Sequence, residues 1–230
     1  MVKFESMLFK VLKFVAVIFL FFFIPSIPFI VHDLFNHDIN SLSNSDVIYF
    51  SLISNIVLLL VLFVIYRKDL IKEFKIFKNN LGECMSCGFK WWLIGLGGMM
   101  VSNILIQSLL NQDQAANEQA VQEMITVLPW IMLISAGFLV PIIEEICFRK
   151  TFYDLIKNKW VFIFSSGLLF GVLHVVLIMS DPIELLFIIP YGVLGVVFAI
   201  MYHKTKNVYT PIVMHMIHNV ILVSLAIFLL

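Results

Sequence analysis

The amino-acid sequence predicts an all-α fold: a polytopic transmembrane helical bundle of about seven spans with a cytoplasmic N-terminus. Three observations predict it: a composition that is 61% hydrophobic and 13% charged, seven apolar runs of about twenty residues, and a one-sided distribution of basic residues. Such a composition is typical of multi-pass membrane proteins and excludes an ordinary soluble domain. The formal net charge of zero provides no basic face, so we expect no nucleic-acid partner.

Each apolar run is long enough to cross a hydrocarbon core of about 30 Å at about 1.5 Å per helical residue. The first run could also be a signal peptide, but it is long, contains two prolines and lacks a small-residue cleavage site, so we expect a retained helix. The runs are Phe14–Val31, Val47–Tyr66, Trp91–Leu110, Leu128–Phe148, Trp160–Met179, Leu185–Tyr202 and Val208–Leu230.

The basic residues support this division into spans. All 15 Lys and Arg residues fall before the first run or in alternate loops, whereas the intervening loops contain Asp and Glu but no Lys or Arg. The positive-inside rule then places the N-terminus in the cytoplasm. We expect one integrated membrane domain in a cell membrane, with N-terminal helices and loops over residues 1–127 and a second part over residues 128–230. The composition, rich in Ile, Phe, Lys and Asn, favours a bacterial cytoplasmic membrane.

Three features outside the spans leave alternatives open. Residues 69–81 have apolar side chains at helical spacing, which fits either a helix along the membrane surface or a loop helix packed on the bundle. Residues 111–127 form a polar external loop, helical in part, to which the sequence assigns no role. Cys84 and Cys87 form a C-x-x-C pair without a second pair to complete a zinc site, which favours two ordinary thiols over a metal site.

Few strongly polar residues remain inside the second half, and they fall on three spans. Ionisable groups in a membrane usually face one another or a wet cavity, so we expect these three helices to converge on one polar pocket. The residues are Glu144, Glu145 and Arg149 on the fourth span, His174 on the fifth, and His215, His218 and Asn219 on the seventh.

Helical spacing predicts how these side chains pair. Glu145 and Arg149 are four residues apart with the acid first, which is the favoured order for an ion pair. Glu144 is rotated by about 100° around the helix axis from Glu145, so it does not share the face of that pair. His215 and Asn219 share a helix face in the same way. Glu144 reaches the depth of His174 only if the fourth helix continues past Arg149, and we therefore expect it to extend to about Ile156.

A carboxylate and two imidazoles around a wet pocket suit hydrolysis. Glu144 can take a proton from water, His174 can help to hold that water, and His215 with Asn219 can stabilise an oxyanion. Glu144, His174 and His215 could instead bind a zinc ion that activates the water. The cofactor is therefore either none or zinc, and the sequence alone does not separate the two. Cys147 is predicted to be a small packing residue.

At these residues the sequence resembles the CPBP family of intramembrane proteases, over about residues 128–222. "EEICFR" (Glu144–Arg149) fits EExxxR, "FGVLH" (Phe170–His174) fits FxxxH, and "HMIHN" (His215–Asn219) fits HxxxN. That family includes CAAX prenyl endopeptidases and bacterial Abi proteins linked to bacteriocin self-immunity, and both glutamate-only and metalloprotease descriptions of it are in use. The resemblance implies that residues 128–230 are the catalytic core.

The resemblance also implies roles for the matching positions. Glu144 would be the general base with His174 beside it, His215 and Asn219 would form the oxyanion site, and Glu145 with Arg149 would shape the pocket. Independently of the resemblance, Phe170 lies four residues before His174 on one helix face, so its ring can support the imidazole. A peptide or membrane-protein segment would be the substrate. Two alternatives remain: a non-catalytic immunity or scaffold protein that binds a toxin or sensor partner, and a proton-coupled transporter, which the absence of a repeat disfavours.

Overall fold

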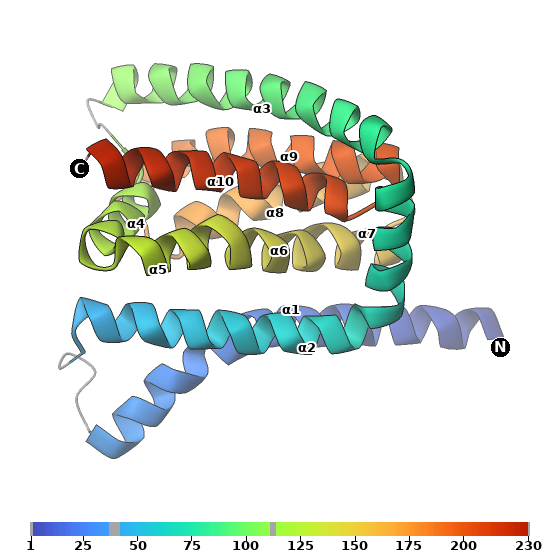
Figure 1. The fold of residues 1–230 in the computed structure, drawn as a ribbon, viewed down its shortest axis with the longest axis horizontal. Helices are drawn as coiled ribbons and strands as arrows, with labels where there is room; N and C mark the ends of the chain where they lie inside the picture. The colour runs from blue at the N-terminus through green and yellow to red at the C-terminus, as the bar shows by residue number, and fades with distance from the viewer. Residues whose placement is uncertain (1, 37–41, 111–113, 230) are drawn as a thin grey trace. The chain divides into compact units, whose positions relative to one another are not determined.

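The computed structural model describes residues 2–36, 42–110 and 114–229 (Figure 1). Residues 111–113, where the predicted external loop begins, and Leu230, where the last predicted span ends, lie outside the described residues. All the regular secondary structure of the described residues is helical. Seven of the helices are long and apolar enough to cross a membrane. The predictions of an all-α bundle and of seven spans are confirmed, and the chain is a multi-pass membrane protein.

The helices follow one another with short connections. Their bounds are α1 Val2–Asn36, α2 Asn44–Asn79, α3 Leu81–Leu110, α4 Ala116–Val127, α5 Pro129–Ile134, α6 Val140–Glu145, α7 Thr151–Leu155, α8 Lys159–Val176, α9 Ile188–Thr205 and α10 Tyr209–Leu229. Within the predicted external loop, residues 116–127 are thus helical, as α4. Two compact units divide the chain: the first comprises Met1–Ile71, Glu123–Leu155 and Met216–Leu230, and the second Lys72–Gln122 and Ile156–His215.

In the first unit, α5, α6 and α7 are parts of one continuous helical span, Pro129–Leu155 (Figure 1). This confirms the predicted extension of the fourth span beyond Arg149. Two π-helical turns, Ser135–Leu139 and Ile146–Lys150, join the three parts. Each π turn places one extra residue in the helix and changes the direction of the side chains that follow.

In the second unit, α8 and α9 run side by side, with α3 packed against α9 (Figure 1). Glycine permits the close approach of α8 and α9. A Cβ atom added to Gly171 would lie 2.6 Å from the carbonyl oxygen of Ile188, and one added to Gly195 would lie 2.8 Å from the carbonyl oxygen of Gly167. Small residues at such a crossing let two membrane helices pack backbone to backbone.

A buried glutamate fixes the start of α10. The Glu73 carboxylate accepts a 2.7 Å hydrogen bond from the backbone N–H of Val208, and the Glu73 carbonyl accepts one of 2.7 Å from the side chain of Asn207. Lys206, just before, has the left-handed backbone conformation that ends α9, with φ of 53°. Glu73 belongs to the predicted amphipathic segment 69–81, which is continuous with α2 as far as Asn79. Its placement along the membrane surface stays a prediction.

Candidate active site

The two glutamates lie at the C-terminal end of α6. Glu145 forms an ion pair with Arg149, with 3.1 Å between Oε2 and Nε, and both side chains are fully buried. This is the pair that helical spacing predicts. Glu144 is 9% exposed. A charge inside a membrane is costly, so a fully buried ion pair at this position holds a defined local arrangement of side chains.

The π turn that carries Arg149 is braced by hydroxyl groups. The Thr151 hydroxyl donates to the carbonyl of Ile146 at 2.9 Å. Because its only proton is used there, the 2.7 Å contact between the hydroxyls of Tyr66 and Thr151 must have Tyr66 as the donor. The irregular turn is thus tied to α2, within the same unit.

His174 is held in one orientation by a backbone contact and two rings. Its Nδ1 lies 2.8 Å from the carbonyl oxygen of Phe170. A carbonyl only accepts, so Nδ1 carries a proton, and in the neutral imidazole Nε2 is left as the acceptor. The ring centroids of Phe170 and Tyr191 lie 4.3 and 4.9 Å from that of His174. The buttressing of His174 by Phe170, expected from their spacing, is present.

His215 lies against the same phenylalanine. Its ring stacks on Phe198 at 4.7 Å between centroids and meets Phe170 edge to face at 5.7 Å. The imidazoles of the second and third motifs therefore lie on one aromatic ring, although 41 positions separate them in the sequence (215 − 174). His215 itself is buried, at 3% exposure.

Asn219 is fixed by a break in the helix that carries the glutamates. The Val140 N–H bonds to the carbonyl of Ser135, and Pro141 has no N–H to donate, so the carbonyl of Ala136 lacks its helical donor. The Asn219 amide nitrogen donates to that carbonyl at 2.9 Å. The Asn219 side chain retains a second N–H and its oxygen for other partners. His218, whose role the sequence does not assign, is buried.

The second unit also docks the start of α4 beside His174. Ala115 is buried in an apolar cluster with Val175 and Phe187. The Ala116 N–H donates to the carboxylate of Glu184. The Asn117 amide donates to the Tyr191 hydroxyl at 3.4 Å. The sequence assigns no role to this loop, and Tyr191 is not among the predicted site residues, although a tyrosine within an apolar span is a signal that could have identified it.

No group of three or more His, Cys, Asp or Glu side chains that could hold a metal ion occurs among the described residues. The zinc alternative on Glu144, His174 and His215 stays a prediction, as does the meeting of the glutamates and histidines in one pocket. Cys84, Cys87 and Cys147 are free thiols, and Cys147 is fully buried.

Known proteins are similar to the part of this chain that contains Glu144, Glu145, Arg149 and the two site histidines. Residues 126–221 match the family described as "Type II CAAX prenyl endopeptidase Rce1-like". The "Putative membrane peptidase YdiL" of Bacillus subtilis is 31% identical over 113 residues, which is 48% of this chain and 43% of that protein. The "UPF0177 protein YaiH" of Lactococcus lactis is 31% identical over 114 residues, which is 50% of this chain and 45% of that protein.

A second Lactococcus lactis protein, "UPF0177 protein YbdI", is 25% identical over 175 residues, covering 73% of this chain and 89% of that protein. The chain spans less than half the length of the first two relatives. No solved structure matches the chain. The matched segment, residues 126–221, contains the glutamate helix, both histidine helices and Asn219, and it is this part of the chain that is similar to the CAAX prenyl endopeptidase family.

Proposed function

We propose that this protein is an intramembrane endopeptidase of the bacterial cell membrane, which hydrolyses a peptide bond of a peptide or membrane-protein segment. The observation that carries the proposal is that the imidazoles of His174 and His215 both contact the ring of Phe170, while the Nδ1 of His174 carries the proton. The peptidase family matched by residues 126–221 supports it.

In the proposed reaction Glu144 is the general base. Water gives one proton to the Glu144 carboxylate while its other O–H donates to Nε2 of His174, the acceptor that the tautomer leaves. The water oxygen bonds to the scissile carbonyl carbon. Glu144 then returns the proton to the departing amine as the carbon–nitrogen bond breaks.

The oxyanion of the tetrahedral intermediate is assigned to donors on α10. An N–H of His215 and the second N–H of Asn219 would donate to it, because both residues lie on one face of that helix. Glu145, paired with Arg149, shapes the site without taking part in proton transfer. If a zinc ion is present, Glu144, His174 and His215 would hold it, and it would supply Lewis-acid activation of the water.

The test is cleavage of a peptide library by the purified chain in detergent. Glu144→Gln keeps the side-chain volume and removes the base, so we expect a loss of about 10²–10⁴-fold in rate. Glu123→Gln, the same change at an exposed position of α4, is the matched control and should cleave like wild type. Wild-type cleavage by Glu144→Gln would refute the proposed base.

Chelation decides the mechanism. Activity that a chelator removes and zinc restores would assign a metal to the glutamate and histidine set, whereas activity indifferent to chelation would assign water activation to Glu144 unaided.

The biological setting, bacteriocin immunity or peptide processing, is proposed from the family resemblance. If a cellular phenotype survives Glu144→Gln, the non-catalytic binding role would replace the enzyme.

A further inference from the structure

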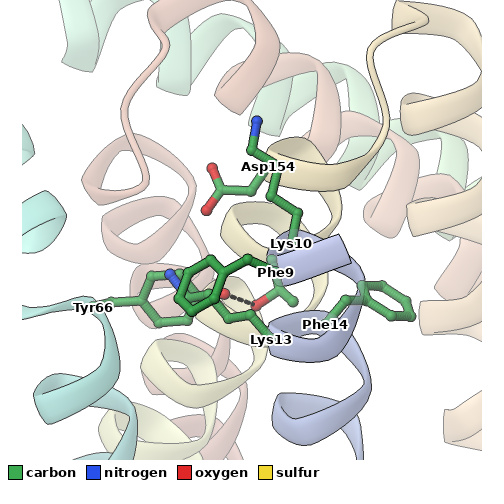
Figure 2. A pocket seen from close by; sticks show the side chains of 7 residues that line it. Phe9, Lys10, Lys13, Phe14, Tyr66 and Asp154 are labelled. Carbon is green, nitrogen blue, oxygen red and sulfur yellow. Dashed lines mark hydrogen bonds between the residues drawn. The ribbon is translucent and has the colours of Figure 1, made fainter. Parts of the chain in front are cut away.

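A cavity of the first unit is lined by none of the candidate active-site residues. It has a volume of about 220 Å³ and lies between α1, α2 and α7. Figure 2 shows its lining, with Lys10 and Lys13 on α1, Tyr66 on α2 and Asp154 on α7. Such a volume corresponds to roughly seven molecules of liquid water at about 30 Å³ each, which admits a small polar group.

The hydrogen-bond donors of this cavity are ammonium groups. The Tyr66 hydroxyl donates to Thr151 and the Thr151 hydroxyl to Ile146, so neither has a proton left for a ligand. The Lys13 ammonium lies 3.6 Å from the centre of the Tyr66 ring, and Lys10 is one helical turn away on the same face of α1. Ammonium groups that line a partly apolar pocket favour an anion.

The acidic side chains near the cavity are already engaged. Lys150 forms ion pairs with Asp154 at 3.2 Å and with Asp69 at 3.8 Å. Three ammonium groups, of Lys10, Lys13 and Lys150, thus stand against two carboxylates, an excess of one positive charge. The carboxylates therefore reduce the positive charge of the pocket without cancelling it.

The cavity also lies where a membrane lipid can reach it. Tyr66 stands at the end of the second apolar run, immediately before Arg67 and Lys68, so the cavity is at the basic boundary of the spans. Phe9 lines it and is 68% exposed, and neighbouring Leu8 and Leu12 of α1 are 50% and 57% exposed. A basic pocket between transmembrane helices with apolar side chains beside it fits an anionic lipid headgroup and its chain.

We propose that this pocket binds a phosphate anion, carried by the headgroup of an anionic membrane lipid, with Lys10 and Lys13 donating to the phosphate oxygens. The chemistry recognised is that of the phosphate group, which free phosphate shares. The lipid is the occupant that the exposed apolar side chains of α1 favour. The proposal is independent of peptidase activity.

The test is native mass spectrometry of the full chain in detergent, with phosphatidylglycerol or phosphatidylcholine added. Wild type is expected to retain one phosphatidylglycerol. Lys10→Gln with Lys13→Gln should weaken retention by roughly 25-fold, since one lysine near a membrane surface is worth about fivefold. Lys75→Gln with Lys78→Gln makes the same charge change at exposed positions of α2 and should leave retention within twofold.

If both double variants lost phosphatidylglycerol equally, binding would depend on a diffuse basic surface and the proposal would be overturned. Retention of phosphatidylcholine equal to that of phosphatidylglycerol would also overturn it. Displacement of the lipid by millimolar inorganic phosphate would assign the site to free phosphate, and failure to displace it would assign the site to the lipid. Lys10→Arg with Lys13→Arg preserves charge and donors and must retain the lipid. If the double Gln variant does not fold, Lys10→Gln alone should show a fivefold loss.

Discussion

The two units hold their parts of the candidate site by different forces. In the first unit, Glu145 is fixed by a buried charge partner, and the helix around it departs twice from α geometry. In the second unit, His174 and His215 are fixed by neutral aromatic rings and one carbonyl. A buried charge that loses its partner is expensive, whereas a ring that loses a neighbour loses mainly its orientation. Mutations that break the contacts of the first unit should therefore mainly lower stability, whereas mutations that break those of the second unit should mainly lower the rate of catalysis.

The largest expected effect follows from removing the positive partner in the first unit. Arg149→Met leaves the Glu145 carboxylate buried without its ion pair and should lower the free energy of unfolding by about 3–5 kcal/mol. The double variant Glu145→Gln with Arg149→Met removes both charges and should recover most of the loss. Denaturant unfolding in detergent measures both. A double variant as unstable as the single one would contradict the dominance of charge in this unit.

A smaller effect is expected at the polar anchor of the second unit. Glu73→Ala deprives the Val208 N–H at the start of α10 of its acceptor, which should cost about 1–3 kcal/mol. Glu73→Gln keeps an acceptor oxygen and should lose less than half as much. Thermal unfolding compares the two. If Glu73→Ala is as stable as wild type, the start of α10 is held by other contacts.

Some of this architecture follows from the sequence because it depends on local periodicity. The length of each apolar run predicts a span, and the four-residue spacing of Glu145 and Arg149 predicts their ion pair. The need to bring Glu144 to the depth of His174 predicts that the fourth helix continues beyond Arg149.

Other features depend on contacts between distant segments. The Asn219 side chain donates to the Ala136 carbonyl, and the Glu73 carboxylate accepts from the Val208 N–H at the start of α10. Neither contact can be predicted before the helices are packed. The stacking of Tyr191 on His174 is of the same kind, since no sequence spacing links a residue of α9 to one of α8. Local propensity carries no information on such pairs, because they exist only in the folded bundle.

The smallest and most discriminating effect concerns Tyr191, whose ring and hydroxyl can be separated by mutation. An aromatic pair is worth about 0.5–1.5 kcal/mol, so Tyr191→Leu, which frees the face of His174, should lower kcat by roughly 2- to 13-fold with KM unchanged. Tyr191→Phe keeps the ring, removes only the acceptor of Asn117, and should stay within about twofold of wild type, as should Asn117→Ala. Steady-state cleavage with a melting curve for each variant makes the measurement. A fall in Tyr191→Phe as large as in Tyr191→Leu would mean that the hydroxyl and the docked start of α4, rather than the stacked ring, orient His174, and aromatic packing would no longer distinguish the second unit from the first.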